Sequence, residues 1–151
     1  MDKMQSFLKE RFDDFNNKYF EGKLTVKSIV FISGLVNYDH FAGYSPDHDQ
    51  IFIAHKVLNM PIWVLDYLIM HEMTHVYDRK CLHEKMTHSK EFWAKVGEYE
   101  HTEWARGYLE AYSLKFRFID FLGEYLQWRI RSFWTFLELK TIGKTYYTIY
   151  D

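Results

Sequence analysis

The sequence has one cysteine and two prolines among its 151 residues, and no apolar run approaches the length of a membrane span. A lone cysteine, Cys81, excludes an internal disulfide framework and a separate cysteine-rich zinc ribbon. The first residues are charged and lack a continuous apolar stretch, which argues against a secretory signal. Acidic and basic residues nearly balance, so a net charge of −2 gives no global case for nucleic-acid binding. We therefore expect one globular domain without a membrane span, in the cytoplasm or another reducing intracellular compartment.

The spacing of apolar residues predicts an α+β fold. Apolar residues at helical spacing predict a helix over residues 3–20 that ends near Gly22. Residues 24–32 are rich in β-branched and aromatic types and predict a strand, and two further strands are expected around residues 35–44 and 50–54. The turn-rich segment 45–49 joins the last two strands and predicts a hairpin. A second long helix is expected to start at Asn59 or Met60, with Pro61 in its first turn.

The motif His71-Glu72-x-x-His75 carries the most chemical information in the chain. On a helix, residues four apart lie on one face, so the two imidazoles can bind one Zn²⁺. Glu72 then lies beside the metal and can act as the general base toward zinc-bound water, whose pKa falls to about 7. The alternative is a pair of structural histidines on a half-buried helix. The apolar stripe of the helix runs through the motif and leaves the histidines at its border, which favours the ligand interpretation.

A catalytic zinc site normally takes three protein ligands and keeps one position for water. The downstream residues that offer a suitable ligand atom are His83, Glu84, His88, Glu91, Glu98 and His101. Spacing alone leaves this choice open.

The segment His88-Ser89-Lys-Glu91-Phe92-Trp93, taken with the HExxH motif, resembles the SprT-like and YgjP-like zincin metalloproteases, which include the Spartan-type proteases. The resemblance covers roughly residues 10–100. It implies that His88 is the third ligand of a single Zn²⁺. It also implies a zincin-like fold with an N-terminal helix, a small antiparallel or mixed three-stranded sheet and two zinc-bearing helices. The expected substrate is a protein or peptide, and nucleic acid is a partner by resemblance only.

Further residues are expected around the metal. In zincins an extended peptide pairs with the strand beside the cleft, and by resemblance this is the strand that holds Ile51 and Ile53. Tyr44, Tyr77 and His101 are alternatives for a second electrophile, and the sequence does not choose among them. The expected hydrogen-bond acceptors for the ligand imidazoles are Asp78, Glu91 and Glu98. His40, His48 and His55 suggest a second metal, but they have no recognised ligand spacing, so a solvated turn is the better interpretation.

The chain after residue 101 departs from the family pattern. We expect a metalloprotease domain over residues 1–101 and a helical, aromatic-rich extension over residues 102–151 that packs on it or regulates it. A purely structural role is the simplest. The basic residues interleaved with aromatics also suit a partner or nucleic-acid surface: Lys115, Arg117, Arg129, Arg131, Lys140 and Lys144. The strand-like segment 141–150 could instead act as an internal inhibitor.

The sequence thus predicts a zinc metallopeptidase in which His71, His75 and His88 hold the metal and Glu72 is the catalytic base. Two alternatives stay open. One is a hydrolase that uses the same metal site on a bond other than a peptide bond. The other is a binding or scaffold protein with a structural zinc and a partner-binding aromatic tail.

Overall fold

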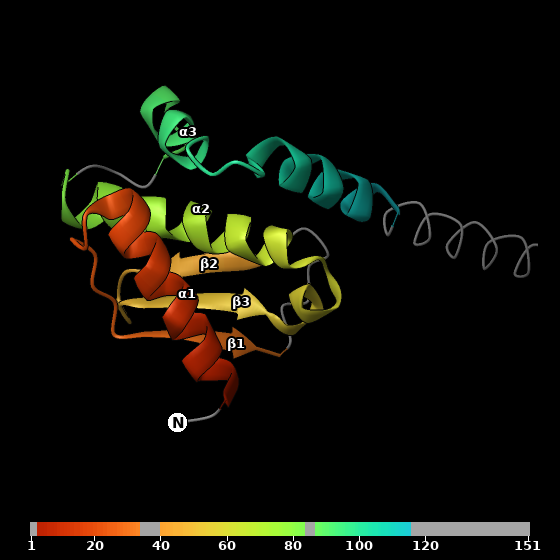
Figure 1. Ribbon diagram of the computed structural model, residues 1–151, viewed down its shortest axis with the longest axis horizontal. Helices are drawn as coiled ribbons and strands as arrows, with labels where there is room; N and C mark the ends of the chain where they lie inside the picture. Colours follow the sequence, from red (N-terminus) through yellow and green to blue (C-terminus); the bar gives the residue numbers. More distant parts are fainter. Residues whose placement is uncertain (1–2, 34–39, 84–86, 116–151) are drawn as a thin grey trace, which may run out of the picture. The chain divides into compact units, whose positions relative to one another are not determined.

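The computed structural model describes residues 3–33, 40–83 and 87–115 (Figure 1). The chain divides into two compact units, Met1–Ala111 and Tyr112–Asp151. The order of elements is α1 (Lys3–Phe20), β1 (Ser28–Ile32), β2 (Ala42–Ser45), β3 (Gln50–Ala54), a short 3-10 helix (His55–Asn59), α2 (Ile62–Lys80) and α3 (Lys90–Val96). Residues 102–115 are also helical. The predicted segments beyond residue 115, with the expected inhibitory strand, lie outside the described residues.

The N-terminal helix α1 confirms the predicted span of residues 3–20. Its buried residues Leu8, Phe12, Asn16 and Phe20 recur every four positions and form one face. Asn16 is a buried polar residue whose amide donates to the Leu24 carbonyl (2.8 Å) and accepts from the Leu24 N–H (3.0 Å). The helix is followed by Gly22, whose φ of 70° is a conformation that glycine adopts without strain.

The three strands form a mixed sheet in the order β1-β3-β2, in which β1 is parallel and β2 antiparallel to β3. The predicted hairpin is confirmed by the pairing of Ala42 with Ile53 and of Ser45 with Gln50. Strand β1 begins at Ser28, later than the predicted residue 24. The reason is that the backbone of Leu24 is bonded to the Asn16 side chain and does not enter the sheet.

The central strand β3 carries the core of the sheet. Ile51 and Ile53 are completely buried, and both sides of β3 are already hydrogen-bonded to neighbouring strands. The expectation that an extended peptide adds to the strand of Ile51 and Ile53 is therefore wrong, because that strand has no free edge. Strands β1 and β2 form the two edges of the described sheet, and β2 is the edge strand that contacts α2.

Helices α1 and α2 cover the same face of the sheet, with α1 against β1 and α2 against β2 (Figure 1). The two helices are joined by Arg11 and Asp66, whose side chains meet in two hydrogen bonds of 2.5 and 2.7 Å. Helix α2 begins at Ile62, so Pro61 is its N-cap and does not lie in the first turn as expected. The predicted long helix through the HExxH motif is otherwise confirmed.

Helix α3 packs on α2 through the buried residues Phe92 and Val96. It begins where the Ser89 hydroxyl accepts a hydrogen bond from the Phe92 N–H (3.1 Å), which is an N-cap. This cap fixes the chain direction immediately after His88. No helix in the part of the chain that the structure describes is both long and apolar enough to cross a membrane.

Candidate metal centre

The side chains of His71, His75 and His88 meet at one point between α2 and the start of α3. One nitrogen from each imidazole lies within 4.8 Å of the other two, and no other such group of histidine, cysteine or acidic residues occurs among the described residues. The Nε2 atoms of His71 and His88 are 3.1 Å apart. The helix places His71 and His75 one turn apart, and the Ser89 cap brings in His88 from the next element.

Two aromatic side chains of α3 hold the imidazoles in place. The Phe92 ring lies 4.5 Å from the ring of His75 and 4.9 Å from the ring of His71, measured between centroids. The Trp93 ring stacks on His88 at 5.3 Å with an interplanar angle of 28°. The Phe-Trp pair of the second motif therefore packs against all three imidazoles and orients them, while His88 stays exposed.

The environment favours neutral imidazoles, the form in which histidine binds a metal. Burial lowers the pKa of His71 to about 3, and the neighbouring charges of His75, His88 and Arg106 act in the same direction. Burial lowers the pKa of His75 to about 4, and His88 adds to the effect. Both side chains are thus free of protons on at least one nitrogen at neutral pH.

Glu72 is 5% exposed. Its burial raises the pKa of the carboxyl group to about 8, and a hydrogen bond from the Tyr44 backbone partly opposes the rise. Strand β2 explains this contact. The Ala54 N–H bonds to the Phe41 carbonyl, so the backbone groups of Phe41 point toward β3. Backbone groups point to alternate sides along a strand, so those of Tyr44, three residues later, point away from β3. A cation bound to the three imidazoles would also lower the pKa of Glu72, so that its carboxyl group is ionised and can accept a proton.

These residues fit a zinc ion. Tetrahedral zinc with Zn–N bonds of about 2.0–2.1 Å holds its ligand nitrogens about 3.3 Å apart, which is close to the 3.1 Å between the Nε2 atoms of His71 and His88. One nitrogen from each of three imidazoles points to the same place, and a hydrogen bond can join only two of them at a time. A shared cation is the partner that satisfies this donor set.

The expected acceptors behind the ligands are not found. The buried Nδ1 atoms of His71 and His75 have no hydrogen-bond partner in the described structure. Asp78, Glu91 and Glu98 therefore do not accept from these two imidazoles, and this part of the expectation is wrong. Glu91 is instead bonded to its own N–H and to the Ser89 hydroxyl, contacts that lower the pKa of its carboxyl group.

Several other residues expected at the site lie outside the histidine cluster. Tyr77, Asp78 and Glu91 line a separate depression of about 330 Å³ between α2 and α3. The Tyr44 hydroxyl donates to Asp49 (3.1 Å). His101 is exposed and lies in a depression with Trp63 and Trp104. Among the described alternatives for a third ligand, only His88 joins His71 and His75.

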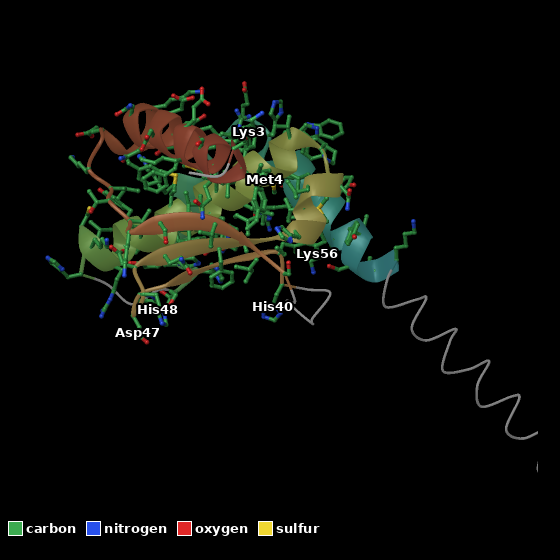
Figure 2. The ribbon with its side chains drawn as sticks, turned by 90° about the horizontal axis from the view of Figure 1, so that it is seen from below. Lys3, Met4, His40, Asp47, His48 and Lys56 are labelled. Carbon is green, nitrogen blue, oxygen red and sulfur yellow. The ribbon has the colours of Figure 1, made fainter. Side chains whose placement is uncertain are left out.

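The other histidines do not form a second metal site among the described residues. His48 bonds to the Ser45 hydroxyl (2.9 Å), and His55 bonds to the Ser33 hydroxyl (2.8 Å). His40 lies near the start of β2, whereas His48 and Asp47 lie at the turn after it (Figure 2). The interpretation of the turn as a solvated segment agrees with these positions.

Two residues near the metal centre were not expected from the sequence. The Tyr67 ring lies 6.0 Å from the ring of His71, and Arg106 lies over the Trp93 ring at 4.8 Å. The position of Tyr67, four residues before His71, was a signal that could have been used, because it shares the helix face of the ligands. Arg106 had no comparable signal in the sequence.

Comparison with known proteins agrees on the fold. The chain is similar to the crystal structure of the metallopeptidase zymogen of Pyrococcus abyssi abylysin, with a TM-score of 0.51 and 19% sequence identity over 66% of this chain and 86% of that one. No protein-family model and no curated protein sequence matches. At this identity the likeness shows that the two chains share a fold.

Proposed function

We propose that this protein is a zinc-dependent metallopeptidase. The observation that carries the proposal is the convergence of His71, His75 and His88 beside the buried carboxyl group of Glu72. The shared fold with a metallopeptidase zymogen supports it. The sequence resemblance to the SprT-like proteases supports the choice of His88 as third ligand.

The roles of the residues follow from their positions. Zinc, when bound, supplies a Lewis acid that polarises the peptide carbonyl and lowers the pKa of water. Glu72 takes a proton from the attacking water as its oxygen bonds to the carbonyl carbon. When the C–N bond breaks, Glu72 gives that proton to the leaving amine. The Tyr44 N–H keeps the carboxylate oriented.

The open edge of β2 is the proposed track for the substrate backbone. Ala42 and Tyr44 occupy the positions whose backbone groups point away from β3. An extended peptide can pair with the groups of this edge other than the Tyr44 N–H, which donates to Glu72, and can add a fourth strand. Because Tyr44 also contacts Glu72, such a peptide would pass directly along the proposed base.

Zinc content and proteolysis together test this proposal. We expect one zinc ion per chain by mass spectrometry of the metal, loss of zinc in His88→Ala, and cleavage of an unfolded protein such as casein. His101→Ala is the matched control, since it removes an exposed histidine outside the cluster and should keep the zinc. Glu72→Gln should keep the zinc and lose the cleavage.

Three other outcomes would replace the proposal. Zinc binding with intact function of Glu72→Gln would indicate a structural metal. Hydrolysis of esters but of no peptide would indicate a different hydrolase. Absence of zinc would leave a binding protein. Action on DNA-associated proteins rests on the family resemblance alone, and stimulation of cleavage by single-stranded DNA is its test.

A further inference from the structure

The guanidinium group of Arg106 lies beside the metal centre without belonging to it. Its central carbon is 4.8 Å from the centroid of the Trp93 ring. Trp93 in turn stacks on His88 and lies 5.7 Å from the ring of His71. Arg106 is therefore held against the aromatic side chain that contacts two of the three proposed ligands.

Arg106 has little opposite charge of its own. Its carboxylate partner among the described residues is Glu103, reached by a single contact of 3.4 Å from one terminal nitrogen, and the Glu103 side chain is 84% exposed. By contrast, Arg11 binds Asp66 through two nitrogens at 2.5 and 2.7 Å. A guanidinium group has five N–H donors in a planar fork that fits a carboxylate. Arg106 thus keeps most of its donors for another partner.

Tyr67 supplies a second donor at the same place. It is 5% exposed, and its ring lies 6.0 Å from the ring of His71. Burial raises the pKa of Tyr67 to about 12, while Arg106 and Glu72 are close enough to act on it as well. A phenol hydroxyl can donate a hydrogen bond to an acceptor.

A bound metal would make this place favour an anion. Arg106 is the cation that acts on Tyr67, and Glu72 and Glu103 are the acidic groups that act on it. A divalent cation at the imidazoles would place more positive charge beside Arg106. An anionic ligand between the metal and Arg106 would relieve the repulsion between them.

We propose that Arg106 and Tyr67 form a recognition position for a carboxylate of the substrate, next to the His71 side of the metal centre. The inference rests on the proposed peptidase function. The carboxylate comes either from an acidic side chain near the cleaved bond or from the C-terminus of the peptide. Both sources present the same planar anion to the guanidinium group.

Matched peptides distinguish the two sources. One series carries glutamate or glutamine at each position next to the cleaved bond, and the other ends in a free acid or an amide. We expect kcat/KM to be roughly tenfold higher for the form with a carboxylate at the preferred position. In Arg106→Gln that preference should disappear through a higher KM, with kcat nearly unchanged. Arg106→Lys should keep part of it, and Tyr67→Phe should lose a smaller share.

Lys9→Gln is the matched control, because Lys9 is also an exposed cation in a helical ion pair, with Asp13 on α1. This variant should keep the full preference. A wild-type enzyme that cleaves both members of every peptide pair equally well would overturn the inference and leave the peptidase function intact. So would an Arg106→Gln variant that loses thermal stability but keeps the preference, since Arg106 would then only support Trp93.

Peptide binding to the Glu72→Gln variant gives a readout that does not need catalysis. Fluorescence anisotropy of the labelled carboxylate peptide should show binding about tenfold weaker when Arg106→Gln is added. If no peptide is cleaved but this difference in binding is found, the proposed function fails and the carboxylate position stands. If binding is the same with and without Arg106, the position is refuted.

Discussion

Two carboxylates of the same helix, Asp66 and Glu72, are buried to nearly the same degree but have opposite surroundings. Asp66 is 7% exposed and is bound by Arg11 through two short hydrogen bonds. Glu72 is 5% exposed and has no ion pair in the described structure. A buried, paired carboxylate stabilises a helix contact, whereas a buried carboxylate without a cation costs stability and is kept where chemistry needs it. The comparison separates Asp66, which holds α2 in place, from Glu72, the proposed catalytic base on the same helix.

The largest expected effect is on activity. Glu72→Gln should lower kcat for peptide cleavage by about 10²–10⁴-fold, because the amide cannot accept the proton. Its oxygen can still accept the Tyr44 N–H, so the zinc content should not change. Asp66→Asn should leave kcat of the folded enzyme unchanged. Equal losses of kcat in the two variants would mean that the comparison does not separate catalysis from folding.

The next largest effect is on the free energy of unfolding, and here Asp66→Asn should have a larger effect than Glu72→Gln. Asp66→Asn should lower the free energy of unfolding by about 2 kcal/mol, since it weakens a largely buried ion pair and leaves Arg11 without its partner charge. Urea unfolding measures this loss. The exposed pair of Lys9 and Asp13 provides the control, and Asp13→Asn should change stability by no more than about 0.5 kcal/mol. An equal effect at both sites would show that the burial of Asp66 adds nothing.

In the metal-free protein, the dependence of stability on pH should show the raised pKa of Glu72. The folded pKa of Glu72 is raised to about 8, so between the ordinary value of 4.5 and pH 8 the folded state holds a proton that the unfolded state has lost. Stability therefore falls as pH rises through this window. His71 and His75, with pKa values lowered to about 3 and 4, contribute the opposite slope and only below about pH 6.5.

Between pH 6.5 and 8 the Glu72 slope should stand alone. Wild-type protein treated with a chelator should lose on the order of 2 kcal/mol across this interval relative to Glu72→Gln. Urea titrations of the two proteins at several pH values measure the difference. Parallel curves would indicate that the Glu72 carboxyl group is already ionised at pH 6.5.

The two carboxylates also show where sequence reasoning works. The HExxH spacing identifies Glu72 because its chemistry is encoded by neighbours on one helix, and α1, the hairpin and α2 follow from equally local patterns. The pairing of Asp66 with Arg11 joins residues 55 positions apart. The order of the strands, with β3 between β1 and β2, is also a long-range property, and a local sequence pattern does not predict which strand has a free edge.

The residues of the metal centre also fall into those that the sequence identifies and those that only the tertiary structure shows. The family resemblance identifies His88, and spacing alone does not, since six residues offer suitable ligand atoms. Arg106 was missed because its place beside Trp93 depends on how the helix after residue 101 packs on α2 and α3. Whether the Nδ1 atoms of His71 and His75 meet a hydrogen-bond acceptor also depends on packing, and in the described structure they do not. Local periodicity predicts which residues share a face, but only tertiary structure shows what that face meets.

Ser89 tests whether a partnered group can still serve the site, and its expected effect is the smallest. It resembles Asp66 in having a fixed partner, the Phe92 N–H, but it directly follows the proposed ligand His88. Ser89→Ala removes the cap of α3 and should cost about 1 kcal/mol. If that cost falls on the orientation of His88, zinc affinity should drop by about fivefold, as measured by competition with a chelating dye. Ser89→Thr should restore the affinity because threonine also caps helices, and Ser33→Ala, which removes a serine bonded to His55, should leave it unchanged. A loss of stability with unaltered zinc affinity would instead place Ser89 with Asp66, among the groups that hold the fold and do not tune the metal.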